Sequence, residues 1–481
     1  MDETPSERSP QLIRGLGPWD GALLTIGAMV GTGIFITTGD IAKSLPYPGL
    51  ILLVWFLSGL LTLAGALTYA ELGTMFPRAG GMYHFLREAY GPLPGFLYGW
   101  TCFLVIMSGG IAAIAVGFAE YLGVFLPFFS TQHVLLTVPV GPWRWALSGG
   151  QVAAAGAIAL LTVINYVGLK EGAWVQNLLT VVKLGAVVGF AALGFFAVPS
   201  VQPALAAVSP STGLVAAFGV GMIASLWSYD GWYGLALSAG EVRDPGRNLL
   251  RGLAWGTAAV IAMYMALNLV YVRALPVAAM AASPRIGEAA AAALFGPGGA
   301  RVVSFLVLVS AFGCLAATIL YAARIYLAMA QDGLFFRGIG KVEPRFRTPG
   351  RSLLVQGVWS MVLTLSGTYD ALYTYAMFAA VLFHVATGAT VFVLRRTRPE
   401  HPRPYRVWGY PWVPVLFIVA SGLLVVNTLI ERPVESLWGL GLVALGLPAY
   451  AYWRRRGAAL RGSTAQVAVT EDPAAGDSGP L

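Results

Sequence analysis

Charged residues are scarce in this chain: Asp, Glu, Lys and Arg make up 11% of its 481 residues, whereas 57% are hydrophobic. An ordinary soluble domain is about a quarter charged, so this composition excludes one. Histidine and cysteine are scarcer still, with 4 and 2 residues. The histidines show no metal-ligand spacing, and Cys102 and Cys314 lie inside apolar runs, where we expect them to be packing residues. We therefore expect no metal site and no cofactor.

Long apolar runs account for the missing charge. Each is long enough to cross a hydrocarbon core of about 30 Å. In lipid every backbone polar group needs an internal partner, and these runs are continuously apolar rather than alternating, so they predict helices and not a barrel. We expect an all-α membrane protein with twelve transmembrane helices, over residues 16–38, 48–73, 93–126, 150–169, 173–197, 211–240, 248–274, 298–332, 352–367, 370–394, 409–430 and 435–453.

The basic residues follow these spans. Most of the 30 Lys and Arg residues fall in alternate loops, on the side that also holds both ends of the chain. By the positive-inside rule, this predicts a multi-pass protein of the plasma (inner) membrane with both termini cytoplasmic. The same distribution explains the net charge of +8 without a nucleic-acid partner, and it leaves the lipid bilayer as the surrounding partner.

Two spans carry interruptions near mid-membrane. The first contains three glycines within the run 27–35, and the sixth contains a carboxylate within the run 225–232. Paired interruptions at corresponding places in two halves are a sequence pointer to the binding site of a transporter. The halves would be two inverted repeats, 16–197 and 211–394, followed by two helices over 409–453. A cytoplasmic tail, 1–15, would precede them, and a disordered tail, 457–481, would follow.

The chemistry of a broken helix follows from its exposed backbone groups. Its second half begins with unpaired N–H groups that suit a carboxylate, and its first half ends with unpaired carbonyls that suit an ammonium. An amino acid carries both groups about one such gap apart. The predicted N–H donors are Gly31, Thr32, Gly33 and Ile34. The predicted carbonyl acceptors are Met29, Trp227 and Asp230. The alternative for the glycines is helix–helix packing, and for Trp227 and Trp232 it is a buried aromatic pair.

Four motifs then resemble one family. The sequence Gly-Thr-Gly-Ile-Phe at 31–35 resembles the first-helix signature of the APC (amino acid–polyamine–organocation) superfamily. The sixth-helix motif follows at 227–232, a Glu-x-x-x-Pro-x-Arg-Asn motif at 241–248, and a loop motif at 330–349. The resemblance is closest to the L-type amino acid transporter branch. It implies the five-plus-five inverted-repeat fold of the leucine transporter plus two extra helices, with Ser228 and Tyr229 added to the substrate site.

The resemblance also implies a function. We expect a sodium-independent secondary transporter that exchanges neutral L-amino acids, with cationic ones as a further option, and that works by alternating access. A proton-coupled amino acid or polyamine symporter is the alternative, and a membrane amino acid sensor is an alternative of another class. No nucleophile–base pair points to an enzyme. The animal members with a covalent heavy-chain partner carry a Cys after the third helix; because 127–150 has none, no such partner is expected.

Charges inside the membrane are costly and usually functional. Lys183 lies mid-way along the fifth span, and the resemblance implies that its ammonium replaces the sodium ion of coupled relatives. Asp230 would either line the pocket, favouring a cationic or polar side chain, or cap the broken helix. Trp227 would cover the substrate as a gate. Arg324 would pair with an acidic group at the cytoplasmic end and form a second gate.

Overall fold

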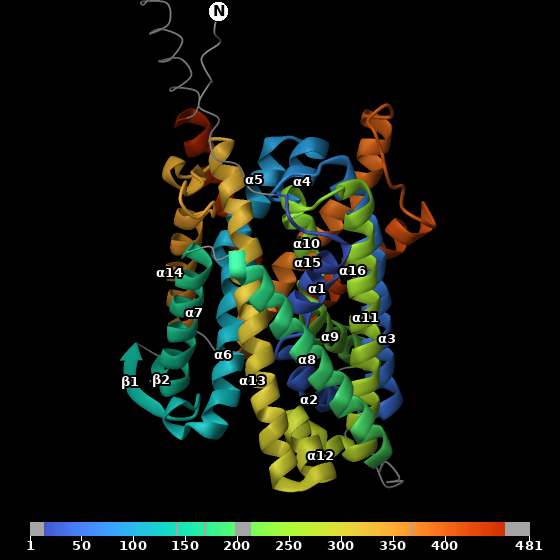
Figure 1. The fold of residues 1–481 in the computed structure, drawn as a ribbon, viewed down its shortest axis with the longest axis vertical. Helices are drawn as coiled ribbons and strands as arrows, with labels where there is room; N and C mark the ends of the chain where they lie inside the picture. Colours follow the sequence, from blue (N-terminus) through green and yellow to red (C-terminus); the bar gives the residue numbers. More distant parts are fainter. Residues whose placement is uncertain (1–13, 141–142, 168–169, 198–212, 367–368, 457–481) are drawn as a thin grey trace, which may run out of the picture.

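The computed structural model describes residues 14–140, 143–167, 170–197, 213–366 and 369–456, and these form a bundle of mostly upright helices (Figure 1). The predicted tail 457–481 and nearly all of the tail 1–15 lie outside the described residues. The α-helices are α1 Pro18–Met29, α2 Thr37–Ser44, α3 Pro48–Met75, α4 Met82–Tyr90, α5 Pro92–Thr101, α6 Met107–Phe125, α7 Gly149–Val167, α8 Lys170–Ala197, α9 Leu214–Tyr229, α10 Gly234–Leu237, α11 Pro245–Ala274, α12 Val277–Ala282, α13 Ile286–Gln331, α14 Gly350–Ser366, α15 Tyr369–Thr397, α16 Trp412–Glu431 and α17 Pro433–Ala444. Short helical turns are η1 Gly33–Phe35, η2 Cys102–Ile106, η3 Pro127–Phe129, η4 Ala239–Glu241 and η5 Arg337–Gly340.

Within the described part of the chain, nine helical segments are long and apolar enough to cross a membrane. The protein is therefore a multi-pass, mostly helical membrane protein, as the sequence predicts. The predicted spans 16–38, 211–240 and 352–367 are not among the nine. The first two fall short because each is interrupted, leaving α1 with 12 residues and α9 with 16, and α14 has 17. The total of twelve spans stays a prediction.

Two of the long spans are irregular. The predicted span 93–126 consists of α5, the π-helical turn η2 and α6. The label α13 covers two helical parts that meet at the non-helical Gly296 (φ 71°), and the predicted span 298–332 corresponds to the second part, from Pro297 to Gln331. Proline removes a helical hydrogen bond and clashes with the preceding turn, which accounts for a kink at this position.

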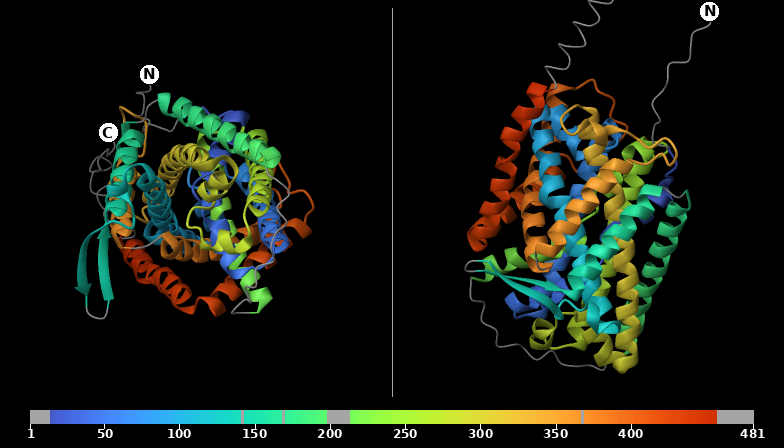
Figure 2. Two further views of the ribbon diagram at one scale, coloured as in Figure 1. Left: turned by 90° about the horizontal axis from the view of Figure 1, so that it is seen from below. Right: turned by 90° about the vertical axis from the view of Figure 1, so that its left-hand side faces the viewer.

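The two interrupted helices lie in the interior of the bundle. Helix α1 packs against α8, α11 and α13, and α9 packs against α2, α3, α15 and α16. Seen from below, α17 lies at the periphery of the bundle (Figure 2). This arrangement leaves the polar groups of both interruptions without access to lipid.

A β-hairpin, which was not among the predicted elements, lies between α6 and α7. Strand β1 Val134–Val140 pairs antiparallel with β2 Trp143–Ser148, and Val138 faces Trp145 in the register. The indole N–H of Trp145 donates to the carbonyl of Leu365, 2.8 Å away, which ties the hairpin to α14. The β-branched residues within 134–140 are typical of a strand, and they are the sequence feature from which the hairpin could have been predicted.

Candidate functional site

The first interruption separates α1, which ends at Met29, from α2, which begins at Thr37. The connecting residues are extended at Val30 and then form the 3-10 turn η1 over Gly33–Phe35. All residues from Gly27 to Gly39 are buried. The backbone polar groups of this stretch are therefore out of water, and each needs a partner.

The carbonyl oxygens at the end of α1 have partners from other helices. The Lys183 ammonium donates to Gly27 O (2.7 Å) and Val30 O (3.0 Å). The Cys314 thiol donates to Ala28 O at 3.0 Å. The hydroxyl of Tyr264 lies 2.9 Å from Met29 O. The carbonyls at the end of α1 thus each have a neighbouring hydrogen-bond donor, and a cation lies at the negative end of the helix dipole.

The N–H groups that follow are different. Among the hydrogen bonds of residues 14–140 and of the other described ranges, none has the N–H of Gly31, Thr32, Gly33 or Ile34 as its donor. The Thr32 hydroxyl is also buried without a hydrogen-bond partner in the described structure. Four consecutive N–H groups and a hydroxyl in a buried site constitute a binding surface for an anionic oxygen group.

The second interruption ends α9 at Tyr229. Asp230 is extended (ψ 154°), Gly231 is left-handed (φ 94°), and the short helix α10 begins at Gly234. The N–H of Asp230 donates to Trp227 O at 3.1 Å. Gly231 is required here because other residues rarely adopt its positive φ.

The two interruptions contact each other reciprocally. A Cβ on Gly33 would lie 2.8 Å from Ser228 Cα, and a Cβ on Gly231 would lie 2.9 Å from Ala28 O. The Ser228 hydroxyl also lies 2.7 Å from the hydroxyl of Thr37, at the start of α2. The Tyr264 hydroxyl lies 2.9 Å from both Met29 O and Ser228 O, and so contacts both broken helices.

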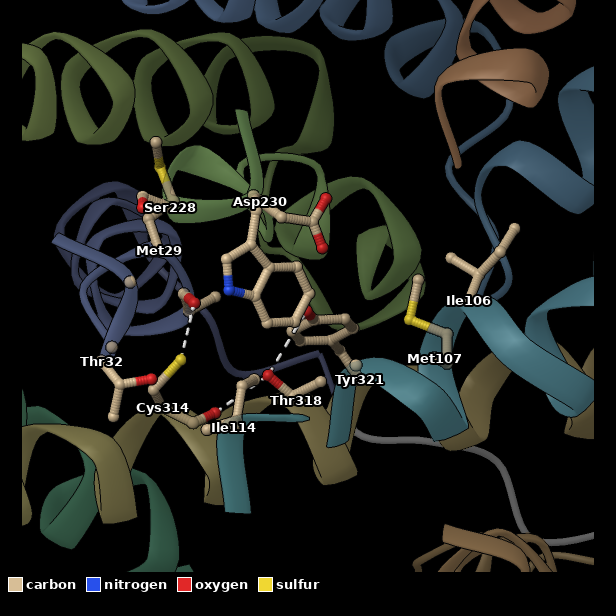
Figure 3. Close-up of a pocket in the computed structure, with 15 residues that line it drawn as sticks. Met29, Thr32, Ile106, Met107, Ile114, Ser228, Asp230, Cys314, Thr318 and Tyr321 are labelled. Atoms are coloured by element: carbon tan, nitrogen blue, oxygen red, sulfur yellow. Dashed lines mark hydrogen bonds between the residues drawn. The ribbon is translucent and has the colours of Figure 1, made fainter. Parts of the chain in front are cut away.

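A small cavity of about 30 Å³ lies between the interruptions, α6 and α13 (Figure 3). In the close-up, the labelled side chains come from all of these elements, with Cys314, Thr318 and Tyr321 from α13. Its walls include Met29, Gly31, Thr32, Gly33, Trp227, Ser228 and Asp230. Seven of the nine residues predicted for the substrate site therefore line one cavity. Ile34 and Tyr229 do not line it: Ile34 is fully buried, and Tyr229 packs against Trp55 and Tyr264.

Asp230 borders this cavity with an incompletely bonded carboxylate. Its Oδ2 accepts a hydrogen bond from the Tyr233 hydroxyl at 3.3 Å, and its buried Oδ1 has no partner in the described structure. No side-chain cap is described at the start of α10. Asp230 thus lies at the cavity wall, where the pocket-lining role requires it.

The other predicted residues lie close to the cavity or beyond it. Trp227 covers one wall, and its ring stacks on Tyr373 at 5.7 Å and 22°. Lys183, which is 1% exposed, lies at the end of α1. Arg324 is placed further along α13, where its guanidinium pairs with both carboxylate oxygens of Glu241, at 2.9 and 3.3 Å.

Several residues of the site were not predicted. Cys314, expected to be a packing residue, lines the cavity, and so do Thr318 and Tyr321. Ser310 donates to Val30 O at 3.0 Å, next to the Lys183 ammonium. These positions depend on the rotation of α13 about its axis, which a uniformly apolar sequence does not reveal.

A buried cavity between two interrupted helices of a multi-pass helical protein is typical of a membrane carrier. A family profile described as "Amino acid permease" matches residues 16–445. The chain belongs to this family, so it is an amino acid transporter and not an enzyme. The predicted membership of the APC superfamily is confirmed.

Characterised relatives agree over nearly the whole chain. The serine/threonine exchanger SteT of Bacillus subtilis (strain 168) is 31% identical, covering 90% of this chain and 95% of its own. The human b(0,+)-type amino acid transporter 1 is 29% identical, covering 93% of this chain and 89% of its own. The human large neutral amino acids transporter small subunit 2 is 28% identical, and the match covers 90% of this chain and 79% of its own.

Proposed function

We propose that this protein is a sodium-independent exchanger of L-amino acids that works by alternating access. The observation that carries the proposal is the set of unpaired N–H groups at 31–34 beside a buried cavity. An α-carboxylate satisfies several such donors at once, which a polyamine does not. The name of the serine/threonine exchanger from Bacillus subtilis supports exchange as the mode of transport.

The substrate lies across the gap between the two interruptions. Its carboxylate accepts from the N–H groups of 31–34 and from the Thr32 hydroxyl. Its α-ammonium donates to carbonyls of the second interruption, where Asp230 O has no described partner and Trp227 O accepts one bond, from the N–H of Asp230. Met29 O, the third predicted acceptor, lies beside the Tyr264 hydroxyl. The side chain extends toward Asp230, so neutral and cationic substrates are both accommodated.

Sodium independence rests on Lys183. Its ammonium occupies the carbonyl end of α1 and donates to two oxygens there. A fixed cation at this place supplies the positive charge that a coupled carrier would take from a bound ion. The amino acid then becomes the only ligand whose binding changes during the cycle.

Alternating access requires the cavity walls to move. A cavity of about 30 Å³ has room for only one or two water molecules, so substrate binding requires an expansion. Trp227 closes the cavity on the side of Tyr373, and the ion pair of Arg324 with Glu241 closes the opposite path. We propose these as the two gates.

The wider framework is the one that the family implies. It comprises inverted repeats over 16–197 and 211–394 with the helices over 409–453 appended, twelve spans, and cytoplasmic termini in the plasma (inner) membrane. The reciprocal contacts of Gly33 with Ser228 and of Gly231 with Ala28 support a symmetric relation between the two interruptions. The proposed transporter works without a covalently bound heavy-chain partner.

Exchange in proteoliposomes tests the function. Purified protein is reconstituted with or without unlabelled L-serine inside, and uptake of labelled serine, alanine and lysine is followed with sodium or potassium outside. An exchanger requires the internal amino acid and is indifferent to sodium. Uptake into empty vesicles driven by a proton gradient would instead identify a symporter, and binding without uptake would identify a sensor.

A further inference from the structure

A second, smaller cavity lies directly behind Asp230, between α3, α9, α15 and α16. It measures about 20 Å³, and its walls include Asp230, His384, Thr62 and Ser421 among apolar side chains such as Met377. Asp230 lines both this rear cavity and the substrate cavity, so it lies between the two. No expectation from the sequence involved the rear cavity.

Two polar atoms of the rear cavity lack partners. They are Asp230 Oδ1 and His384 Nε2, both buried and without a hydrogen bond in the described structure. His384 is only 5% exposed, and its other ring nitrogen, Nδ1, lies 3.0 Å from the hydroxyl of Tyr69. Buried polar atoms without partners are uncommon in native proteins, and they usually mark a bound water or ion.

The rings around His384 hold it in place. Tyr69, Trp232 and Tyr233 lie with their ring centroids 6.0, 5.4 and 5.2 Å from the imidazole. Tyr233 also donates its hydroxyl to Asp230 Oδ2. The imidazole is therefore packed among rings, one of which also contacts the Asp230 carboxylate, and His384 lines the rear cavity but not the substrate cavity.

We propose that one water molecule in the rear cavity joins His384 to Asp230, and that this link makes His384 a positioning residue for substrate selectivity. The volume suffices for one water, which needs about 10–15 Å³. The link takes the ring proton to be on Nε2, which donates it to the water, while Nδ1 accepts from the Tyr69 hydroxyl 3.0 Å away. The water donates in turn to Oδ1.

This chain of hydrogen bonds holds Asp230 as a carboxylate that accepts from two donors, the water and Tyr233. Both donors lie on the protein's side and leave the face toward the substrate open. A carboxylate held in this way attracts a cationic side chain, and a neutral substrate does not require it. The inference rests on the proposed function in one respect, because it takes the substrate side chain to approach Asp230.

The test compares His384→Leu and His384→Gln with the unaltered protein in proteoliposomes. The readout is the rate of lysine exchange relative to alanine exchange. His384→Leu is expected to lower this ratio about tenfold, the effect of losing one hydrogen bond to a charged group, with alanine exchange retained. His384→Gln keeps a donor and restores much of the ratio, and Tyr69→Phe shifts it in the same direction as His384→Leu. Met377→Leu, which alters the same cavity without a polar atom, serves as the control.

An unchanged lysine-to-alanine ratio in His384→Leu, or an unaltered protein that exchanges alanine but no lysine, would overturn the inference while leaving exchange itself intact. Failure of the proposed function would appear differently, as no exchange of any amino acid. An independent readout is a cryo-EM map of the unaltered protein that resolves other buried waters. Density for a water within hydrogen-bond distance of both Oδ1 and Nε2 is expected, and its absence would contradict the link.

Discussion

Gly33 and Ser228 bring the two interrupted helices into contact, and a single added carbon would separate them. A Cβ at position 33 would lie 2.6 Å from Ser228 Oγ and 2.8 Å from Ser228 Cα. Real side chains do not approach this closely, so any residue other than glycine must push the interruptions apart. This contact thus helps to set the spacing of the backbone groups of the two interruptions.

Gly33→Ala is therefore expected to abolish amino acid binding and to destabilise the fold by about 1–3 kcal/mol, the usual cost of overpacking. Binding is measured by the shift in apparent melting temperature on adding L-serine. Gly422→Ala is the matched control, because a Cβ there would meet nothing within 4 Å. A Gly33→Ala protein that binds serine normally would show that the contact does not set the site.

Lys183→Ala is expected to reduce exchange at least tenfold while leaving the protein folded. The substitution removes a charged donor from Gly27 O and Val30 O, and hydrogen bonds from charged groups contribute about 1.5–3 kcal/mol. Exchange and thermal unfolding are measured side by side, with the exposed Lys341→Ala as control. Near-normal exchange would refute the role of the ammonium in place of sodium.

Asp230→Asn is expected to lower exchange of lysine and arginine about tenfold or more relative to alanine, because the amide removes the negative charge at the cavity wall. The measurement is competition of unlabelled amino acids with labelled alanine. If all substrates are lost equally, Asp230 supports the broken helix rather than contacting the side chain.

Arg324→Gln is expected to open the path between α13 and η4. Replacing the buried Arg324 leaves the half-buried Glu241 carboxylate without its ion-pair partner, which favours conformations that hydrate Glu241 further. Cys314 reports on this, since it lines the cavity and becomes the only thiol in a Cys102→Ala background. Labelling by a membrane-impermeant maleimide from the Glu241 side should accelerate several-fold, and serine should slow it. Arg337→Gln, exposed on η5, is the control, and unchanged labelling would contradict the gate.

The two interruptions could be predicted because their signals are local. Three glycines within 27–35 and a carboxylate at 230 have no place in an unbroken apolar helix. Lys183 was predicted for the same reason, as an isolated charge in an apolar run. The places of Tyr264 and Cys314 in the site could not be predicted, because they depend on contacts between residues more than two hundred positions apart in sequence. The rear cavity lined by His384 could not be predicted for the same reason, because it forms only where separate helices meet.

Binding of the α-carboxylate by the backbone at 31–34 is tested by comparing an amino acid with its amide. The apparent melting temperature of the purified protein is recorded with L-alanine, L-alaninamide and a polyamine at equal concentrations, since a ligand of the folded state raises it by mass action. We expect stabilisation by alanine and little or none by the amide or the polyamine. Equal stabilisation by alanine and alaninamide would contradict the account.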